Sequence, residues 1–154
     1  MKYTFISQSK DITFQLGQRL ADLFNLGDIV TLNGDLGAGK TTLTQGIAKG
    51  LKVEDRVISP TFNIMKTYFK ATKPLFHIDA YRLEDANKDI GLEEFIGAEG
   101  IAVIEWPQYI AEYIPTDVLM ISLIHRGDDK REISLSATTA HYQNIIEKIR
   151  GEFK

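Results

Sequence analysis

The chain has 154 residues, 44% of them hydrophobic and 25% charged, which suits a single domain of ordinary size spanning residues 1–154. It contains no cysteine, so disulfides and thiolate metal sites are excluded. Its formal net charge of -3 gives no overall positive potential with which the chain alone could bind nucleic acid tightly. No apolar run approaches the ~20 residues that span a bilayer. We therefore expect a cytoplasmic protein that has neither DNA nor a membrane as a partner.

The first third of the sequence predicts a strand, a helix and a second strand. Residues 4–6 read as a short strand, and Ser9 is placed to cap the helix that follows. Apolar residues at helical spacing indicate that helix, namely Ile12, Leu16, Leu20 and Leu23. Gly27 supplies the stop, and residues 28–32 predict a buried strand that runs straight into a glycine-rich loop.

The rest of the chain predicts a second helix, further strands and a terminal helix. The second helix starts at Lys40 and has Gly50 near its end. Strands are expected at residues 62–69, 75–78 and 101–104. Short helical pieces are expected near residues 92–96. Residues 118–124 and 131–135 flank a turn and predict a hairpin, and about 138–153 predict an amphipathic helix.

Residues 34–41 read Gly-Asp-Leu-Gly-Ala-Gly-Lys-Thr and fit the pattern G-x-x-x-x-G-K-S/T. Glycine lets the backbone approach phosphate closely, and the amides of residues 37–42 can point inward beside the positive end of a helix. Lys40 would then reach the phosphates, and the hydroxyl of Thr41 would hold Mg²⁺. An ordinary glycine-rich turn is the alternative, but the predicted strand and helix on either side favour a phosphate-binding loop.

This setting defines the predicted fold class. We expect an α/β P-loop NTPase, a single three-layer domain with a mixed, partly parallel central sheet.

Two carboxylates follow apolar strands, where ligands gather in doubly wound sheets. Glu105 follows the longer purely apolar run, so it better fits an acid that binds magnesium. Asp79 is a candidate for ordering the attacking water, directly or through a metal-bound water. Each could instead cap a helix or pair with Arg82.

Other polar residues carry weaker signals. Thr61, in a Ser-Pro-Thr-Phe segment, occupies the position of a switch loop that senses the γ-phosphate, although the segment alone reads as a turn. His77 alternates with apolar residues of its strand, and a lone histidine there is more often packed or exposed than a ligand. Trp106 is more often used for burial than for stacking. Among the scattered arginines, none is identifiable from sequence as an arginine finger.

Together these pieces resemble the TsaE family. The resemblance rests on the glycine loop, on residues 59–62, on His77-Ile78-Asp79-Ala80-Tyr81-Arg82-Leu83 and on Glu105-Trp106-Pro107, with Gly91-Leu92-Glu93 also in place. Four motifs in order are far more specific than the loop alone. They cover about residues 7–135 and leave the terminal helix outside. Gln108 stands where an acid often follows Trp-Pro, which puts partner contacts near that loop in doubt.

The resemblance implies an ATPase required for forming threonylcarbamoyladenosine next to the anticodon of tRNA, acting with the TsaB and TsaD proteins and meeting tRNA only through that complex. It implies that Thr41 and Glu105 contact Mg²⁺ and that Asp79 and Thr61 matter for hydrolysis. It places the phosphates of ATP on Gly37, Ala38, Gly39, Lys40, Thr41 and Thr42. Ser9 and Arg131 are weaker candidates for contacts near the adenosine.

We therefore expect a magnesium-dependent ATPase, with Lys40, Thr61, Asp79 and Glu105 as its catalytic residues. Hydrolysis by the chain alone should be slow, because no internal arginine finger is evident and TsaB and TsaD could complete the site. Two alternatives remain open: a nucleotide-dependent switch without essential hydrolysis, and a small-molecule P-loop kinase. No arginine-rich lid segment of the kind that covers a kinase acceptor is visible in the sequence.

Overall fold

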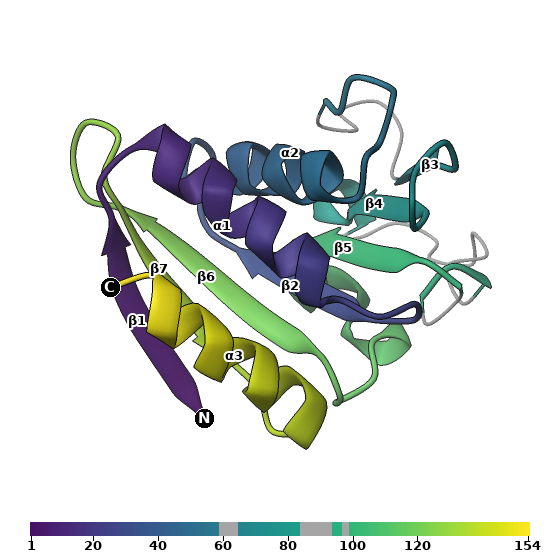
Figure 1. Ribbon diagram of the computed structural model, residues 1–154. Coiled ribbons are helices and arrows are strands. Elements are labelled where there is room, and N and C mark those ends of the chain that lie inside the picture. Colours follow the sequence, from purple (N-terminus) through teal and green to yellow (C-terminus); the bar gives the residue numbers. More distant parts are fainter. Residues whose placement is uncertain (59–64, 84–93, 97–98) are drawn as a thin grey trace.

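A mixed β-sheet forms the centre of the molecule. The computed structural model describes residues 1–58, 65–83, 94–96 and 99–154, and in this part of the chain seven strands pair in the order β1-β7-β6-β2-β5-β4-β3 (Figure 1). The strands are β1 (Lys2–Ser7), β2 (Ile29–Asn33), β3 (Met65–Tyr68), β4 (Leu75–Asp79), β5 (Ile101–Glu105), β6 (Leu119–His125) and β7 (Arg131–Ser136).

The centre of the sheet is parallel and its edges are antiparallel. Strand β2 pairs in parallel with β5 and β6, and β4 pairs in parallel with β5. The antiparallel pairs are β1 with β7, β6 with β7, and β3 with β4. The apolar residues of β5 are buried on both faces, as central strands in α/β folds require. The carboxyl ends of β2, β4 and β5 therefore meet at one edge, and the predicted mixed, partly parallel sheet is confirmed.

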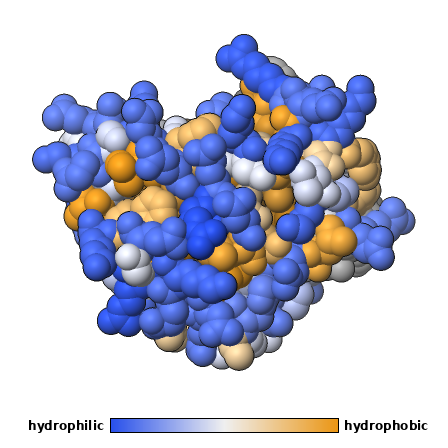
Figure 2. Space-filling model, viewed as in Figure 1, coloured by the Kyte–Doolittle hydropathy of each residue, from blue (hydrophilic) through white to orange (hydrophobic). Residues whose placement is uncertain are grey.

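The helices lie on both faces of the sheet but differ in kind. The α-helices α1 (Lys10–Leu23), α2 (Lys40–Gly50) and α3 (Ala140–Glu152) share one hydrophobic core with one face (Figure 1). A second, smaller core on the other face contains residues of the 3-10 helices η1 (Tyr81–Leu83) and η3 (Pro107–Tyr113). The outer surface over the α-helices is mainly hydrophilic, with apolar side chains in separate patches (Figure 2). The molecule is a single α/β domain.

The sequence predictions agree closely with the described elements. The side chain of Ser9 caps α1 by accepting a hydrogen bond from the amide of Ile12, and β6 and β7 form the predicted hairpin. The strand expected at 62–69 is observed only as β3, since residues 59–64 lie outside the described part. Of the helical pieces expected near 92–96, only residues 94–96 are described: residue 94 is in 3-10 conformation and residues 95–96 form a turn. Residues 84–93 and 97–98 also lie outside the described residues.

Helices α1 and α2 cross at very short range. A Cβ on Gly46 would lie 2.2 Å from the carbonyl oxygen of Phe14, and one on Gly17 would lie 2.4 Å from that of Leu43. Both distances are far shorter than van der Waals contact, so only glycine permits this approach. The crossing fixes the position of α2, whose first residue is Lys40 of the glycine loop.

The C-terminal helix α3 is hydrogen-bonded to the amino end of β2, which is the end away from the glycine loop. The backbone amide of Ile29 donates to the hydroxyl of Tyr142 at 3.0 Å, and Nε2 of His141 lies 2.7 Å from the buried carboxylate of Asp28. Burial raises the pKa of Tyr142 to about 12. Among the described residues, no helix is long and apolar enough to cross a membrane.

Candidate functional site

The glycine loop connects β2 to α2 and turns with two glycines in the left-handed region. Gly37 has φ 80° and Gly39 has φ 106°, conformations that residues with a Cβ rarely adopt. The amide of Ala38 donates to the carbonyl of Asp35 at 3.0 Å, which closes the turn. The loop therefore leads the chain directly into the first turn of α2, where free backbone amides and the helix dipole favour an anion.

A cavity of about 270 Å³ lies over this loop. Its walls come from the start of α1, the glycine loop, the start of α2, the end of β5 and the start of β7. The lining residues are Lys10, Leu36, Gly37, Gly39, Lys40, Thr41, Thr42, Glu105, Trp106 and Arg131. Most of the residues predicted for phosphate and metal binding are thus brought together in one place.

Lys40 is held at the bottom of this cavity by an acid and an aromatic ring. Its Nζ lies 3.8 Å from Oε1 of Glu105 and 4.2 Å from the centroid of the Trp106 ring, and only 5% of the residue is exposed. Burial lowers the pKa of Lys40, while the charges of Glu105, Asp79 and Asp35 oppose that shift. The ammonium is thus poorly hydrated and available for a polyanionic ligand.

Glu105 and Asp79 lie side by side at the carboxyl ends of parallel strands, as predicted. They are register partners in the β4–β5 pair, so both side chains lie on the sheet face that carries α2. Each oxygen of the Glu105 carboxylate has its own partner: Oε1 lies toward Lys40, and Oε2 lies 2.6 Å from Nε2 of His77. His77 is fully buried, so it is packed, and its hydrogen bond to the acid is a feature the sequence did not reveal.

Asp79 occupies a different environment from its neighbour. Its Oδ1 accepts a hydrogen bond from the amide of Tyr81 at 3.1 Å. Desolvation raises the pKa of Asp79, the negative charge of Glu105 adds to that shift, and the amide of Tyr81 opposes it. Asp79 is not among the residues that line the cavity over the glycine loop. A carboxylate with a raised pKa is suited to accepting a proton or orienting water.

Trp106 is placed over Lys40 by an unusual backbone conformation. It follows Glu105 directly and has φ 56° and ψ 51°, in the left-handed region that a bulky side chain rarely occupies. Its ring packs against Tyr81 and Tyr109, with centroid distances of 5.0 Å and 6.2 Å. The strained turn after β5 therefore places the partly buried ring at the edge of the smaller core, as expected, and at the same time against the ammonium of Lys40.

Arg131 contacts the glycine loop directly. From the first position of β7 its Nη2 donates to the carbonyl of Gly37 at 3.2 Å, and Nη1 donates to the carbonyls of Asp128 and Lys130. The side chain thus joins the hairpin to the loop. Ser9, by contrast, does not line the cavity, because its hydroxyl caps α1, while its neighbour Lys10 does.

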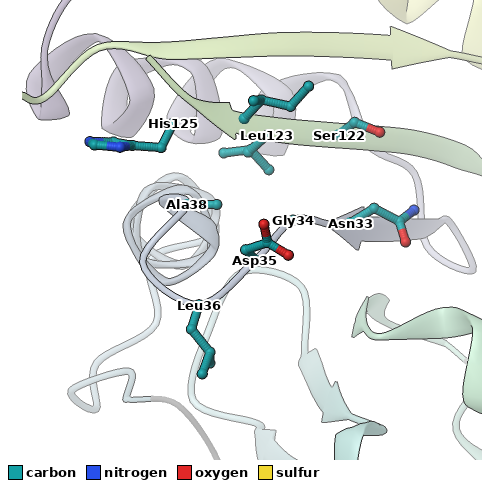
Figure 3. A pocket seen from close by; sticks show the side chains of 9 residues that line it. Asn33, Gly34, Asp35, Leu36, Ala38, Ser122, Leu123 and His125 are labelled. Carbon is teal, nitrogen blue, oxygen red and sulfur yellow. The ribbon is translucent and has the colours of Figure 1, made fainter. Parts of the chain in front are cut away.

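Two of the remaining predicted residues lie elsewhere or are not described. Thr61 falls within residues 59–64, outside the described part of the chain. The side chain of Ala38 lines a second cavity of about 360 Å³ between the glycine loop and β6. Figure 3 shows this space, with Ser122, Leu123 and His125 on the β6 side and Asp35 opposite, while Leu36 points away from β6. Leu36 borders both cavities and is 85% exposed, a position no sequence signal indicated.

The strand order, the glycine loop and the acids at the carboxyl ends of β4 and β5 define a P-loop NTPase fold, which is typical of nucleotide-binding proteins. A model of the family "Threonylcarbamoyl adenosine biosynthesis protein TsaE" matches residues 7–133. The chain belongs to this family, as the sequence motifs indicated.

Relatives and a solved structure support the same assignment. The chain is 45% identical over 123 residues to the tRNA threonylcarbamoyladenosine biosynthesis protein TsaE of Bacillus subtilis, covering 80% of this chain and 78% of that protein. It is 34% identical over 142 residues to the protein of the same name from Nostoc, covering 89% and 87%. The crystal structure of YdiB from Bacillus subtilis superimposes with a TM-score of 0.84 at 33% identity, covering 97% of this chain and 95% of that one.

Proposed function

We propose that the protein is a magnesium-dependent ATPase that supports the TsaB and TsaD proteins in forming threonylcarbamoyladenosine next to the anticodon of tRNA in the cytoplasm. The observation that carries the proposal is the meeting of Lys40, Thr41 and Glu105 in one cavity above the glycine loop. The names of the family and of the Bacillus subtilis relative support the pathway.

The residues at the site fit a nucleotide triphosphate with its metal. The left-handed glycines leave the loop backbone open, and a Cβ on Gly37 would meet nothing within 4 Å, so the cavity has room for phosphate oxygens. Thr41 and Glu105 provide hard oxygen donors of the kind Mg²⁺ prefers. Among the described residues no cluster of three or more His, Cys, Asp or Glu side chains is suited to a metal. Two protein ligands suffice, because Mg²⁺ usually keeps several waters and phosphate oxygens.

Each side chain has a separate task in this proposal. When bound, Mg²⁺ would supply positive charge against the phosphate oxygens. Lys40 exchanges its ion pair with Glu105 for the phosphates and neutralises the charge that develops there in the transition state. Arg131 holds the loop in position by binding the carbonyl of Gly37. Trp106 covers Lys40 and excludes water from its far side.

Asp79 is the residue we propose for orienting the attacking water, with Thr61 as a second contributor. Its carboxylate is adjacent to Glu105 in the sheet but lies outside the set of residues that line the cavity. A water between the carboxylate and the γ-phosphate would fill that separation. The raised pKa of Asp79 increases its basicity, which favours proton acceptance from that water.

The partner proteins are needed to complete the site. Among the described arginines, Arg131 lines the cavity, and its two terminal nitrogens donate to three backbone carbonyls, so we assign it to holding the loop rather than to the transferring group. We therefore propose slow hydrolysis by the chain alone and acceleration by TsaB and TsaD, which would supply the missing positive charge.

Phosphate release measured with and without purified TsaB, TsaD and tRNA tests the proposal. We expect a low rate for the protein alone, a large increase with TsaB and TsaD together, and no increase with tRNA alone. Lys40→Ala should abolish release in every mixture. Maximal turnover without partners would contradict the partner dependence, and phosphorylation of a metabolite with little free phosphate would identify a kinase instead.

A further inference from the structure

We propose that His77 is a positioning residue that fixes the orientation of the Glu105 carboxylate and thereby sets the metal affinity of the site. The inference rests on the proposed function of Glu105 as a magnesium contact. It assigns a task to the fully buried histidine of β4.

The geometry divides the two oxygens of Glu105 between two partners. His77 Nε2 lies 2.6 Å from Oε2, while Oε1 is directed toward Lys40 Nζ at 3.8 Å. An imidazole nitrogen and a carboxylate oxygen at 2.6 Å must share a proton, because two acceptors would repel. Since Glu105 is also beside the ammonium of Lys40, its carboxylate is the acceptor, and Nε2–H of His77 is the donor.

The pairing of β4 with β5 positions His77 beside Glu105. His77 and Glu105 lie on neighbouring parallel strands, and His77 is the register partner of Val103, two residues before the acid. Both side chains are therefore on the same face, with the histidine behind the acid as viewed from the cavity. Neither residue is more than 5% exposed, so water does not compete for the hydrogen bond.

Fixing Oε2 has a consequence for Oε1. A free carboxylate beside a lysine rotates and can present either oxygen, or both, to the ammonium. With Oε2 held by His77, only Oε1 remains available at the cavity, in one orientation. Hydrogen-bonding groups behind a metal ligand typically change metal affinity by about 10–100-fold when removed. His77 would act in this way through Glu105 and without touching the nucleotide.

The test compares two substitutions of His77. His77→Phe keeps an aromatic ring but removes the donor, whereas His77→Gln retains an N–H donor at a similar distance from the backbone. Binding of a fluorescent ADP analogue is titrated in EDTA and again over a range of Mg²⁺ concentrations. We expect His77→Phe to raise the Mg²⁺ midpoint about tenfold, with affinity in EDTA unchanged, and His77→Gln to restore the wild-type midpoint. Equal midpoints for wild type and His77→Phe would overturn the proposal.

Two controls separate the possible failures. Glu105→Gln should shift the Mg²⁺ midpoint if that acid contacts the metal. If it does not, the proposed function of Glu105 has failed, and if it does while His77→Phe has no effect, only the role of His77 has failed.

A spectroscopic measurement on the wild-type protein remains informative if His77→Phe does not fold. A long-range ¹H–¹⁵N spectrum should show His77 with its proton on Nε2. A proton found on Nδ1 alone would overturn the proposal, because Nε2 could not then donate to Glu105.

Discussion

At the residue scale, two neighbouring acids are held in different environments. Glu105 is buried between His77 and Lys40, whereas Asp79 has one amide hydrogen bond and a pKa raised by desolvation. The folded protein therefore stabilises the negative charge of Asp79 poorly. Acids in such environments are common in active sites, where function is obtained at the expense of stability, and this agrees with the role that we propose for Asp79.

Replacing Asp79 with Asn should consequently stabilise the protein at neutral pH. The pKa of Asp79 in the folded state lies above its ordinary value of 3.8, so the folded state binds this proton more tightly than the unfolded chain. Stability from this group is gained as the pH falls through the folded pKa toward 3.8 and is absent at pH 7. We expect Asp79→Asn to raise the free energy of unfolding by about 0.5–1 kcal/mol at pH 7, as measured by urea titration.

The control for this prediction is the pH dependence of the difference. The gain should disappear at a pH below 3.8, where Asp79 is protonated in both states. A variant that is less stable than wild type at pH 7 would show that the hydrogen bond to Tyr81 outweighs the desolvation of the acid.

The residues of the site differ in how far the sequence could predict them. Lys40, Thr41 and Glu105 follow from motif and strand pattern, and the structure brings them together. His77 could not be predicted as a partner of Glu105, because its contact depends on which strands are neighbours and in which register. The contact of Arg131 with Gly37 spans 94 positions in the sequence and depends on the hairpin turning toward the loop.

At the scale of elements, the contact between α1 and α2 determines where the glycine loop lies. Gly17 and Gly46 allow the two helices to approach until backbone atoms are in contact. Hydrophobic periodicity predicted both helices, but it gave no information on this distance, since glycines inside a helix ordinarily signal only a loss of helix propensity. The close packing makes α2 a rigid support for Lys40 and Thr41.

Adding one methyl group at this crossing should be strongly destabilising. The Cβ of Gly46→Ala would lie 2.2 Å from the backbone of Phe14, and backbone cannot move aside without separating the helices. We expect a loss of about 2–4 kcal/mol in the free energy of unfolding and weaker nucleotide binding, both measured on the same preparation.

The matched control is Gly151→Ala, which is also a glycine in a helix. A Cβ on Gly151 would meet nothing within 4 Å, so the greater helix propensity of alanine should leave stability unchanged or raise it by up to about 1 kcal/mol. Similar losses for both variants would contradict the importance of the crossing.

At the scale of the whole molecule, β2 connects two distant features. Its carboxyl end leads into the glycine loop, and its amino end is held by α3 through the hydroxyl of Tyr142. The family match ends at residue 133, yet α3 buries four side chains against the common core. The sequence predicted this helix and its apolar face, but its attachment to Ile29 involves a single hydroxyl, which no periodicity reveals.

The hydrogen bond between Tyr142 of α3 and Ile29 of β2 should make the stability of the protein depend on pH in alkaline solution. The pKa of Tyr142 is raised from 10.0 to about 12 in the folded protein, so the folded state keeps its proton where the unfolded chain loses it. Stability from this group is fully present below pH 10 and is lost as the pH rises toward 12. Tyr142→Phe should lose about 1–3 kcal/mol at pH 7, because Ile29 loses its acceptor.

Thermal unfolding of wild type and Tyr142→Phe at several pH values checks this prediction. The decline in stability between pH 10 and 12 should be smaller for the variant, because the variant has no phenol at this position. An identical decline for both proteins would show that Tyr142 does not titrate as its burial requires.

The most direct test of the function is the formation of threonylcarbamoyladenosine in a mixture of TsaB, TsaD, tRNA, an activated threonylcarbamoyl donor, ATP and the chain carrying Asp79→Asn. This variant should bind ATP with Mg²⁺ as wild type does, and it should be at least as stable, so failure cannot be attributed to unfolding. We expect it to release no phosphate and to support no repeated rounds of product formation. Product formation at the wild-type rate without phosphate release would contradict hydrolysis as the function and would leave a nucleotide-dependent binding switch.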